Sequence, residues 1–207
     1  MAAPTRPSDS ALSDPDRFRR RLLDGLAVSI ADRGYRASTV ADIVRHARTS
    51  KRTFYDHFAG KEECFLELLR TDADELGRAI RAAIDPSADW RQQIRQAVQA
   101  YVDRIEARPA VTLSWIRELP SLGASARPVQ RRGLQLLTDL LVELSGGAGF
   151  ERAGLPPATP ALAVILLAGL RELTAMAVED GRDVREIVGP AVDASVALLG
   201  PRVDPIR

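Results

Sequence analysis

Residues 38–63 constrain the fold more than any other stretch of this 207-residue chain. Ser38 or Thr39 can cap a first short helix. Thr39 is followed three positions later by an acid, which is the spacing of a capping box, and apolar residues recur there at helical spacing. After a turn of four residues, Ser50 is a suitable N-cap for a second short helix, in which Phe54 and Phe58 share one face. The pattern predicts two short helices joined by a tight turn, with a third helix beginning just after them. This is the pattern of a helix-turn-helix.

The opposite face of the second helix is polar and carries Arg52, Thr53 and Asp56. On a helical wheel Lys51 and Tyr55 lie beside the packed aromatic face. We therefore expect Arg52 and Thr53 to point at base edges, while Lys51 and Tyr55 reach sideways toward a phosphate strand. This arrangement suits a recognition helix in the major groove.

Positive charge is concentrated in the same stretch. Residues 33–61 contain seven Lys or Arg and two acids, a local balance of +5, whereas the formal charge of the whole chain is +1. Both lysines of the chain, Lys51 and Lys61, and both histidines, His46 and His57, fall within it. A solvated helix pair would also be basic, but such a concentration is the electrostatic footprint of phosphate binding. Together with the turn, the caps and the aromatic pair it favours nucleic acid.

Three runs within this stretch resemble the DNA-binding region of TetR-type transcriptional regulators: residues 39–43 (TVADI), 50–58 (SKRTFYDHF) and 60–63 (GKEE). The resemblance covers roughly residues 18–69, about a quarter of the chain. It implies that Arg52 and Thr53 help to read bases. It also implies contacts to the DNA backbone by Thr39, Lys51, Tyr55, His57 and Lys61.

Arg48 departs from the pattern of that family, which commonly has glycine at this position of the turn. The position tends toward positive φ, which is costly for a residue with a Cβ. Either the turn bends differently here or Arg48 offsets the strain by contacting phosphate. Arg48 is therefore a further candidate for DNA binding.

The rest of the chain shows helical periodicity, and no stretch alternates as a strand would. We expect an all-α fold with a disordered tail over residues 1–13 and a three-helix helix-turn-helix domain over residues 14–60. A larger helical domain for ligand binding and dimerisation follows over residues 61–207. A long helix over residues 61–84 would connect the two. The single cysteine, Cys64, is expected to be apolar filler.

The resemblance also implies a dimeric regulator, more often a repressor, in which a small apolar effector weakens binding to a near-palindromic duplex operator. Bulky side chains on the central helices are the candidates for lining the effector pocket. Ordinary core packing is the competing interpretation for each of them, and Trp115 is the preferred candidate. These candidates are Trp90, Tyr101, Trp115, Leu119, Leu137, Leu170 and Met176.

Residues 161–170 form an apolar run of ten residues that is followed by Arg171 and Glu172. A membrane span needs about 20 residues, so we expect a soluble, cytoplasmic protein. A helix apolar nearly all round must be covered on every side. Together with a helix over residues 184–199 it would form a four-helix bundle with its copy in a homodimer, or else a purely internal core. The interface candidates are Leu162, Ile165, Leu166, Val188, Val192, Val196 and Leu199.

An enzyme is the main competing class of protein. Two histidines within the basic stretch and one cysteine offer little to a hydrolase or a zinc centre. The glycines of residues 146–149 follow no strand, so they are interpreted as a linker and not as a phosphate loop. We therefore expect no catalytic residue, metal or cofactor. An all-helical protein-interaction module and a regulator without a small-molecule ligand are the alternatives, and binding to duplex DNA would exclude the first.

Overall fold

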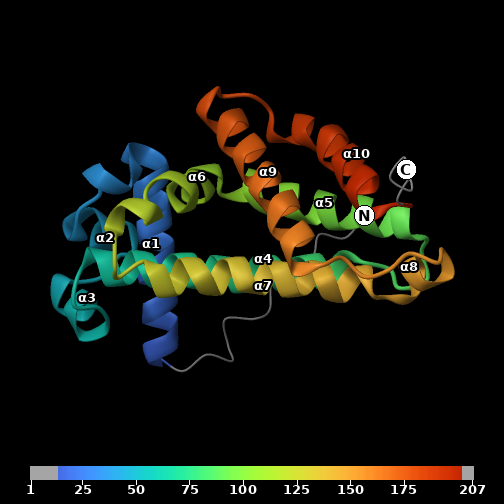
Figure 1. Ribbon diagram of the computed structural model, residues 1–207. Coiled ribbons are helices and arrows are strands. Elements are labelled where there is room, and N and C mark those ends of the chain that lie inside the picture. The colour runs from blue at the N-terminus through green and yellow to red at the C-terminus, as the bar shows by residue number, and fades with distance from the viewer. Residues whose placement is uncertain (1–13, 202–207) are drawn as a thin grey trace, which may run out of the picture. The chain divides into compact units, whose positions relative to one another are not determined.

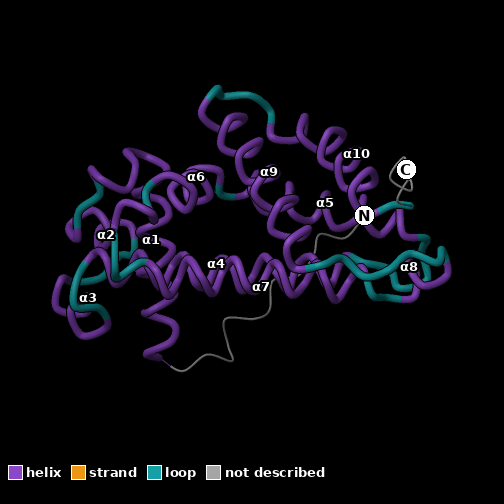
Figure 2. Tube along the Cα trace, in the orientation of Figure 1, coloured by secondary structure: helices purple, strands orange, loops and turns teal. Residues whose placement is uncertain are grey.

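The computed structural model describes residues 14–201, so the tail predicted over residues 1–13 lies outside the described residues. Every regular element within residues 14–201 is a helix, which confirms the predicted all-α fold (Figure 2). The chain forms two compact units, one up to Leu68 and one from Leu69 onward. Each unit is described separately below.

The first unit contains α1 (Asp14–Ala37), α2 (Val40–His46), α3 (Lys51–His57) and the first two turns of α4 (Lys61–Ala83) (Figure 1). Gly34 interrupts α1 with φ 78°, a conformation that a residue without a Cβ adopts at little cost. A Cβ on Gly25 would lie 2.6 Å from a backbone oxygen of α2, so this glycine allows α1 and α2 to cross closely.

Aromatic side chains form much of the core of the first unit. Phe54 and Phe58 are 0% and 1% exposed, with ring centroids 5.7 Å apart, which confirms the aromatic face predicted for the second helix. The Phe65 ring stacks on the Tyr35 ring at 3.9 Å between centroids. Residues from the start of α4 thus belong to the core of the helix-turn-helix.

The boundary between the units therefore lies after Leu68, beyond the position after Gly60 that the sequence suggested. The reason is that Cys64, Phe65 and Leu68 are buried in the first unit. Burial raises the pKa of the Cys64 thiol to about 12, so the side chain stays a neutral, apolar group. This agrees with a packing role for the cysteine.

The second unit is built from the remainder of α4 and a set of helices that differ widely in length (Figure 1). They are α5 (Trp90–Ala107), α6 (Pro109–Arg117), η2 (Leu119–Leu122), α7 (Arg127–Ser145), α8 (Ala148–Arg152), α9 (Pro160–Glu179), η3 (Val184–Ile187) and α10 (Val188–Leu199). The interpretation of the segment after Gly146 as a loop without helix is wrong in part, because α8 forms there. Phe150 of α8 is buried against Trp90, with ring centroids 5.8 Å apart, and this contact holds the short helix.

Helix α9 is 20 residues long, twice the apolar run that the sequence suggested, because Arg171 and Glu172 lie inside the helix and do not end it. Among residues 14–201 it is the one helix long and apolar enough to cross a membrane by length and composition, and 22% of its apolar window is buried. Two of its carboxylates, those of Glu172 and Glu179, bind Arg117 of α6 at 2.8 and 2.7 Å. These ion pairs tie α9 into the second unit.

Candidate nucleic-acid interface and effector cavities

The capping box predicted at the start of α2 is present. Thr39 Oγ1 accepts a hydrogen bond from the Asp42 amide at 3.2 Å, and Asp42 Oδ2 accepts one from the Thr39 amide at 3.1 Å. The Thr39 hydroxyl also donates to Asp42 Oδ2 at 2.7 Å. This bond, with further help from Arg33 and Arg45, holds the pKa of the Asp42 carboxyl below its usual value. Thr39 is exposed and fixes the start of α2 at the same time.

The turn between α2 and α3 places Arg48 at φ 50°, in the left-handed region that favours glycine. The first of the two alternatives for this turn, a different bend, is therefore wrong. Arg21 on α1 supports the turn, because its Nη2 donates to the carbonyl of Ala47 at 2.5 Å and to that of Arg48 at 2.9 Å. The Thr49 amide closes the turn on the Val44 carbonyl at 3.0 Å. Arg21 thus has a structural role that helical spacing did not indicate.

Ser50 is the N-cap of helix α3, as the sequence predicted. Its hydroxyl accepts a hydrogen bond from the Thr53 amide at 3.1 Å. Lys51 and Arg52 are exposed on its first turn, and Thr53 is half-buried with its hydroxyl 3.0 Å from Ser50 Oγ. Tyr55 is 58% exposed. Its ring meets the buried Phe54 ring edge-on at 5.4 Å, so the ring position is fixed while the hydroxyl faces outward.

His57 is the last residue of α3 and is half-buried. The basic and hydroxyl-bearing residues of α3 therefore share a helix whose opposite side is anchored by phenylalanine. This is the geometry that a recognition helix requires.

Lys61 is held differently from the lysine that the resemblance implied. Its Nζ donates to the carbonyls of Tyr35, Arg36 and Ser38 at 3.0, 3.2 and 2.9 Å, and it lies 4.5 Å from the centroid of the Tyr35 ring. An ammonium group has three donors, so these three bonds use them all. Partial burial lowers the pKa of Lys61. Lys61 therefore secures the end of α1 to the start of α4, and its contact with the DNA backbone stays a prediction.

Two cavities lie within the second unit. The larger has a volume of about 280 Å³ and is lined from α4, α5, α6, α7 and α9. Four of the predicted pocket residues line it, namely Tyr101, Trp115, Leu137 and Leu170. A Cβ on Gly133 would lie 2.5 Å from the Trp115 ring, so the position of this ring depends on a glycine in α7.

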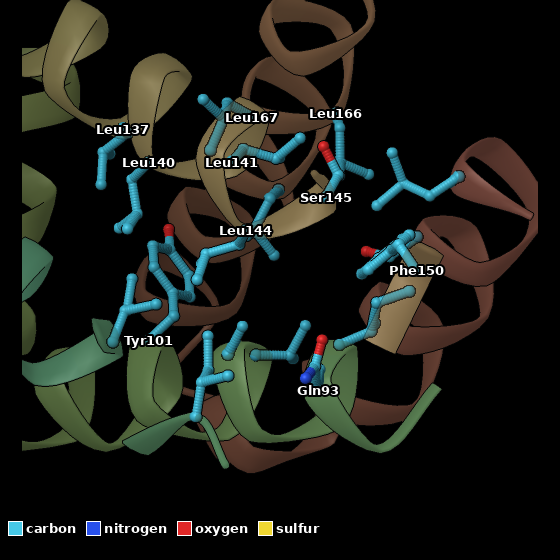
Figure 3. Close-up of a pocket in the computed structure, with 18 residues that line it drawn as sticks. Gln93, Tyr101, Leu137, Leu140, Leu141, Leu144, Ser145, Phe150, Leu166 and Leu167 are labelled. Carbon is cyan, nitrogen blue, oxygen red and sulfur yellow. The ribbon is translucent and has the colours of Figure 1, made fainter. Parts of the chain in front are cut away.

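The smaller cavity, of about 100 Å³, lies among α5, α7 and α9 and is closed by α8 and α10 (Figure 3). Tyr101, Leu137, Leu167 and Leu170 line both cavities. The Tyr101 hydroxyl lies 2.9 Å from Thr174 Oγ1, and burial raises the pKa of the phenol. Tyr101 therefore stands as a neutral side chain at the boundary between the cavities.

Three of the predicted pocket residues line neither cavity. Trp90 is buried in the core against Phe150, and Leu119 is fully buried in η2. Met176 is 46% exposed on α9, whereas its neighbours Thr174, Ala175 and Ala177 are buried. Bulk and a central position do not tell which side of a helix faces a void, and a role in effector binding stays a prediction for these three residues.

The predicted dimer-interface residues divide between the two sides of α9 and α10. Ile165 is 63% exposed and Leu162 is half-buried, whereas Leu166 lines the smaller cavity. On α10 the prediction is wrong in orientation. Val192 is 4% exposed in the core of the unit itself, and Val188, Val196 and Leu199 pack against that same core. The exposed residues of α10 are instead Gly189, Pro190, Asp193, Ala194, Ala197 and Leu198.

These features define a helix-turn-helix protein whose second, helical unit contains internal cavities. In the first unit, residues 22–68 match the sequence model for bacterial regulatory proteins of the tetR family. The resemblance drawn from the three motifs of the sequence is thereby confirmed.

Curated relatives match about half of the chain. The transcriptional activator FasR of Mycolicibacterium smegmatis is 37% identical over 91 residues, which are 44% of this chain and 42% of FasR. The transcriptional repressor KstR2 of Mycobacterium tuberculosis is 34% identical over 109 residues, 53% of this chain and 54% of KstR2. The chain thus spans about half the length of the curated relatives that it matches.

The fold of solved regulators extends further along the chain. The fatty acid degradation regulator FadR of Bacillus halodurans has a TM-score of 0.74 at 20% identity, over 88% of this chain and 99% of its own. FadR of Bacillus subtilis, solved in complex with stearoyl-CoA, has a TM-score of 0.73 at 16% identity, over 89% of this chain and 99% of its own. At these identities the likeness is one of fold.

Sequence reasoning missed two groups at the larger cavity, Arg131 of α7 and Arg171 of α9. Both arginines lie one or two positions away from apolar residues in the sequence. Helical spacing gave a usable signal for Arg131, since it lies three residues before Leu134 on the same helix. Nothing in the sequence indicated that the two helices face one another across a void.

Proposed function

We propose that this protein is a dimeric, sequence-specific DNA-binding transcriptional regulator, more specifically a repressor released by a small-molecule effector. The observation that carries the proposal is the exposed basic face of α3, supported by Phe54 and Phe58 in a unit of the tetR family. Among the relatives, KstR2 is named a repressor and FasR an activator. A cytoplasmic location and the absence of a catalytic step are part of the proposal.

On DNA, Arg52 and Thr53 would read base edges, while Lys51 and Tyr55 would bind phosphate. Arg48, whose carbonyl is held by Arg21, keeps its side chain exposed at the turn and is proposed as a further phosphate contact. In a dimer the two recognition helices would lie about 34 to 36 Å apart, one helical turn of DNA. We expect a near-palindromic operator for that reason.

The test is selection of bound duplexes by the purified protein, followed by sequencing and fluorescence anisotropy. Arg52→Ala should cost about 1 to 3 kcal/mol and relax the preference at one position of each half-site. Arg20→Ala on the exposed face of α1 is the matched control and should leave that preference intact. Equal affinity for selected and random duplexes at physiological salt would refute the proposed function.

The partner that we propose for α9 and α10 is a second copy of the chain. Ile165, Val164, Leu173 and Met176 expose apolar surface on α9, and Leu198 does so on α10. Closed two-fold dimers bury the same surface on both subunits. Light scattering should give a dimer, and Ile165→Glu should give a monomer that binds operator poorly. Val28→Glu, at a similarly exposed apolar residue of α1, should remain dimeric.

The cavities of the second unit support a small-molecule effector, as does the stearoyl-CoA complex of a protein with this fold. An effector that prefers the state with low DNA affinity would lower that affinity about 5- to 150-fold. Because the coupling is reciprocal, operator DNA must weaken effector binding by the same factor. Unchanged effector affinity in the presence of operator would favour the alternative of a regulator without this control.

A further inference from the structure

The two cavities of the second unit lie end to end along the same helices. Helix α7 contributes residues 130–137 to the larger cavity and residues 137–145 to the smaller one. The segment that ends α4 does likewise, with residues 69–76 lining the larger and Ile80 and Ile84 the smaller. At 1.5 Å of rise per residue, the lining stretch of α7 is about 22 Å long. The combined space is therefore long and narrow, which suits an extended chain and not a compact ligand.

The smaller cavity accepts only apolar groups. None of its lining residues is exposed or charged. Its polar side chains are already bonded to the backbone: Gln93 Nε2 donates to the Asp85 carbonyl at 3.0 Å, Ser145 Oγ to that of Val142 at 3.0 Å, and Ser195 Oγ to that of Ala191 at 2.7 Å. A polar ligand group placed here would lose its hydration without gaining a partner.

The larger cavity reaches the surface at a positively charged end. Arg131, Arg171 and the 45%-exposed Leu134 line it together with Gln130. Arg171 donates one bond to the Ile116 carbonyl at 3.2 Å, which fixes its guanidinium at the wall of the cavity and leaves further donors.

Asp72 is the one carboxylate among the lining residues of the larger cavity. It is paired with Arg104 at 2.8 Å and lies 3.9 Å from Arg108. Its charge is thus already balanced by groups that do not line the cavity. The lining therefore presents a net positive charge to a ligand at the open end.

Tyr101 separates the two cavities. Its ring stands between α5 and α7, with Leu137 and Leu140 nearby (Figure 3). Thr174 Oγ1 donates its own proton to the Leu170 carbonyl at 2.8 Å, so the Tyr101 hydroxyl is the donor in their 2.9 Å bond. This bond holds the Tyr101 ring in place where it borders both cavities.

We propose that the two cavities form a single site for an elongated amphiphile with an anionic end. Arg131 and Arg171 bind the anion, the chain runs along α7, and Tyr101 limits its entry into the smaller cavity. The combined volume of about 380 Å³ lies within the usual range of roughly 300 to 1,000 Å³ for ligand sites, whereas each cavity alone falls below it. The role of such a ligand as effector rests on the proposed function.

The anionic end is tested by titrating the full chain with decanoate, decyl phosphate and 1-decanol, using calorimetry and tryptophan fluorescence. Decanoate and decyl phosphate distinguish a carboxylate from a phosphate head. At least one anion should bind about 10- to 100-fold more tightly than the alcohol, because hydrogen bonds to charged groups are the strong ones. The double variant Arg131→Gln with Arg171→Gln should lose this preference.

Arg132→Gln is the matched control, since Arg132 is the exposed neighbour of Arg131, pairs with Asp74 at 3.3 Å and is not among the lining residues. It should keep the preference for the anion. Equal binding of the alcohol and both anions, or an unchanged preference in the double variant, would overturn the assignment of the arginines.

The role of Tyr101 is tested with saturated carboxylates of increasing length. For the wild type, the gain in affinity per added methylene should become smaller, without vanishing, once the larger cavity is full, because further methylenes must pass the Tyr101 ring to enter the smaller one. Tyr101→Ala should extend the gain to longer chains, and Tyr101→Leu serves if the alanine variant does not fold. Tyr101→Phe keeps the ring and removes the bond to Thr174, so it should shift the limit less. If affinity depends on chain length in the same way for the wild type, Tyr101→Phe and Tyr101→Ala or Tyr101→Leu, then Tyr101 sets no limit on chain length.

Operator binding is measured on the same preparations and decides a different question. Amphiphile binding with the expected head and length dependence supports the site even where no duplex is bound. Sequence-specific DNA binding without any amphiphile binding supports the proposed function and refutes the site.

Discussion

The two units differ in how their helices are held. In the first unit, side chains bind backbone groups at helix ends: Thr39 and Ser50 cap α2 and α3, Arg21 binds the turn carbonyls, and Lys61 binds the end of α1. Each of these contacts is directional and permits one arrangement. The first unit is thus a rigid frame for the exposed residues of α3.

The second unit also has helix caps, at Asp89, Thr159 and Asp183, but its long helices pack mainly through apolar faces and ion pairs. Its helices enclose two cavities, and Arg117 joins α6 to α9 through Glu172 and Glu179. Exposed ion pairs contribute little to stability, and apolar contacts can be remade when a helix shifts. The comparison teaches that the unit that positions α3 has little freedom, whereas the unit with the cavities can change shape around a ligand.

The largest difference between the two units is expected in the free energy of unfolding that is lost when a core side chain is truncated to alanine. Phe54→Ala should lower the free energy of unfolding of the first unit by about 3 to 5 kcal/mol, because Phe54 is fully buried in a close-packed core. Leu137→Ala in the second unit should cost about 2 kcal/mol or less, since Leu137 already borders both cavities. Urea unfolding of the two variants measures this. Equal losses would break the contrast in packing between the units.

Lys61 and Lys51 separate structure from DNA contact within the first unit. Lys61→Met should lower the free energy of unfolding by about 2 kcal/mol, because it removes three hydrogen bonds from an ammonium group to carbonyls. Lys51→Met should leave stability unchanged and reduce the salt dependence of DNA binding by about 1 phosphate contact. A lower salt slope in Lys61→Met together with unchanged stability would restore Lys61 as a phosphate ligand.

Acidification is expected to act in opposite directions on the two units. The bond from Thr39 lowers the pKa of Asp42 in the folded state, so its contribution to stability is present above the unfolded value near 3.8 and is lost as pH falls through the folded pKa. Burial raises the pKa of Asp72, against the influence of Arg104, so this residue adds stability as pH falls through its folded pKa toward 3.8.

Unfolding curves of the wild type, Asp42→Asn and Asp72→Asn between neutral pH and pH about 3 measure both effects. Asp42→Asn should weaken the loss of stability as pH falls. Asp72→Asn should remove the gain in stability that the wild type obtains when Asp72 is protonated at low pH. The same pH dependence in both variants would contradict the assignment of opposite shifts.

The two units also differ in how far their structure was predictable from sequence. The caps at Thr39 and Ser50 and the Phe54–Phe58 face are encoded within a few neighbouring residues and were predicted. The left-handed conformation of Arg48 was one of two alternatives for the turn. The contacts of Arg21 and Lys61 were not predicted, because their partners lie 23 to 27 positions away, among carbonyls that carry no sequence signal.

In the second unit the sequence predicted apolar helices but not their orientation. Met176 and Val192 show the reason: α9 and α10 are apolar on nearly every side, so periodicity leaves the buried face undetermined. Trp90 fills the core because Phe150 packs against it, and no spacing in the sequence links these two residues. The cavities therefore had to come from the structure, whereas Tyr101, Trp115, Leu137 and Leu170 were correctly placed as central bulky groups.

The smallest change in the free energy of unfolding is expected for variants of Arg48, the residue of the first unit with a strained, left-handed backbone. A left-handed residue with a Cβ costs roughly 1 kcal/mol, but glycine loses about 0.5 to 1 kcal/mol more backbone entropy on folding. Arg48→Gly should therefore stabilise the protein by at most about 0.5 kcal/mol, and Arg48→Ala should give no gain, since it keeps the Cβ. If the Arg48 side chain contacts phosphate, both variants bind DNA more weakly and with a lower salt slope, regardless of their stability. Wild-type DNA affinity in Arg48→Ala would assign this arginine to the turn alone, where its carbonyl accepts from Arg21 and its amide donates to the Arg45 carbonyl.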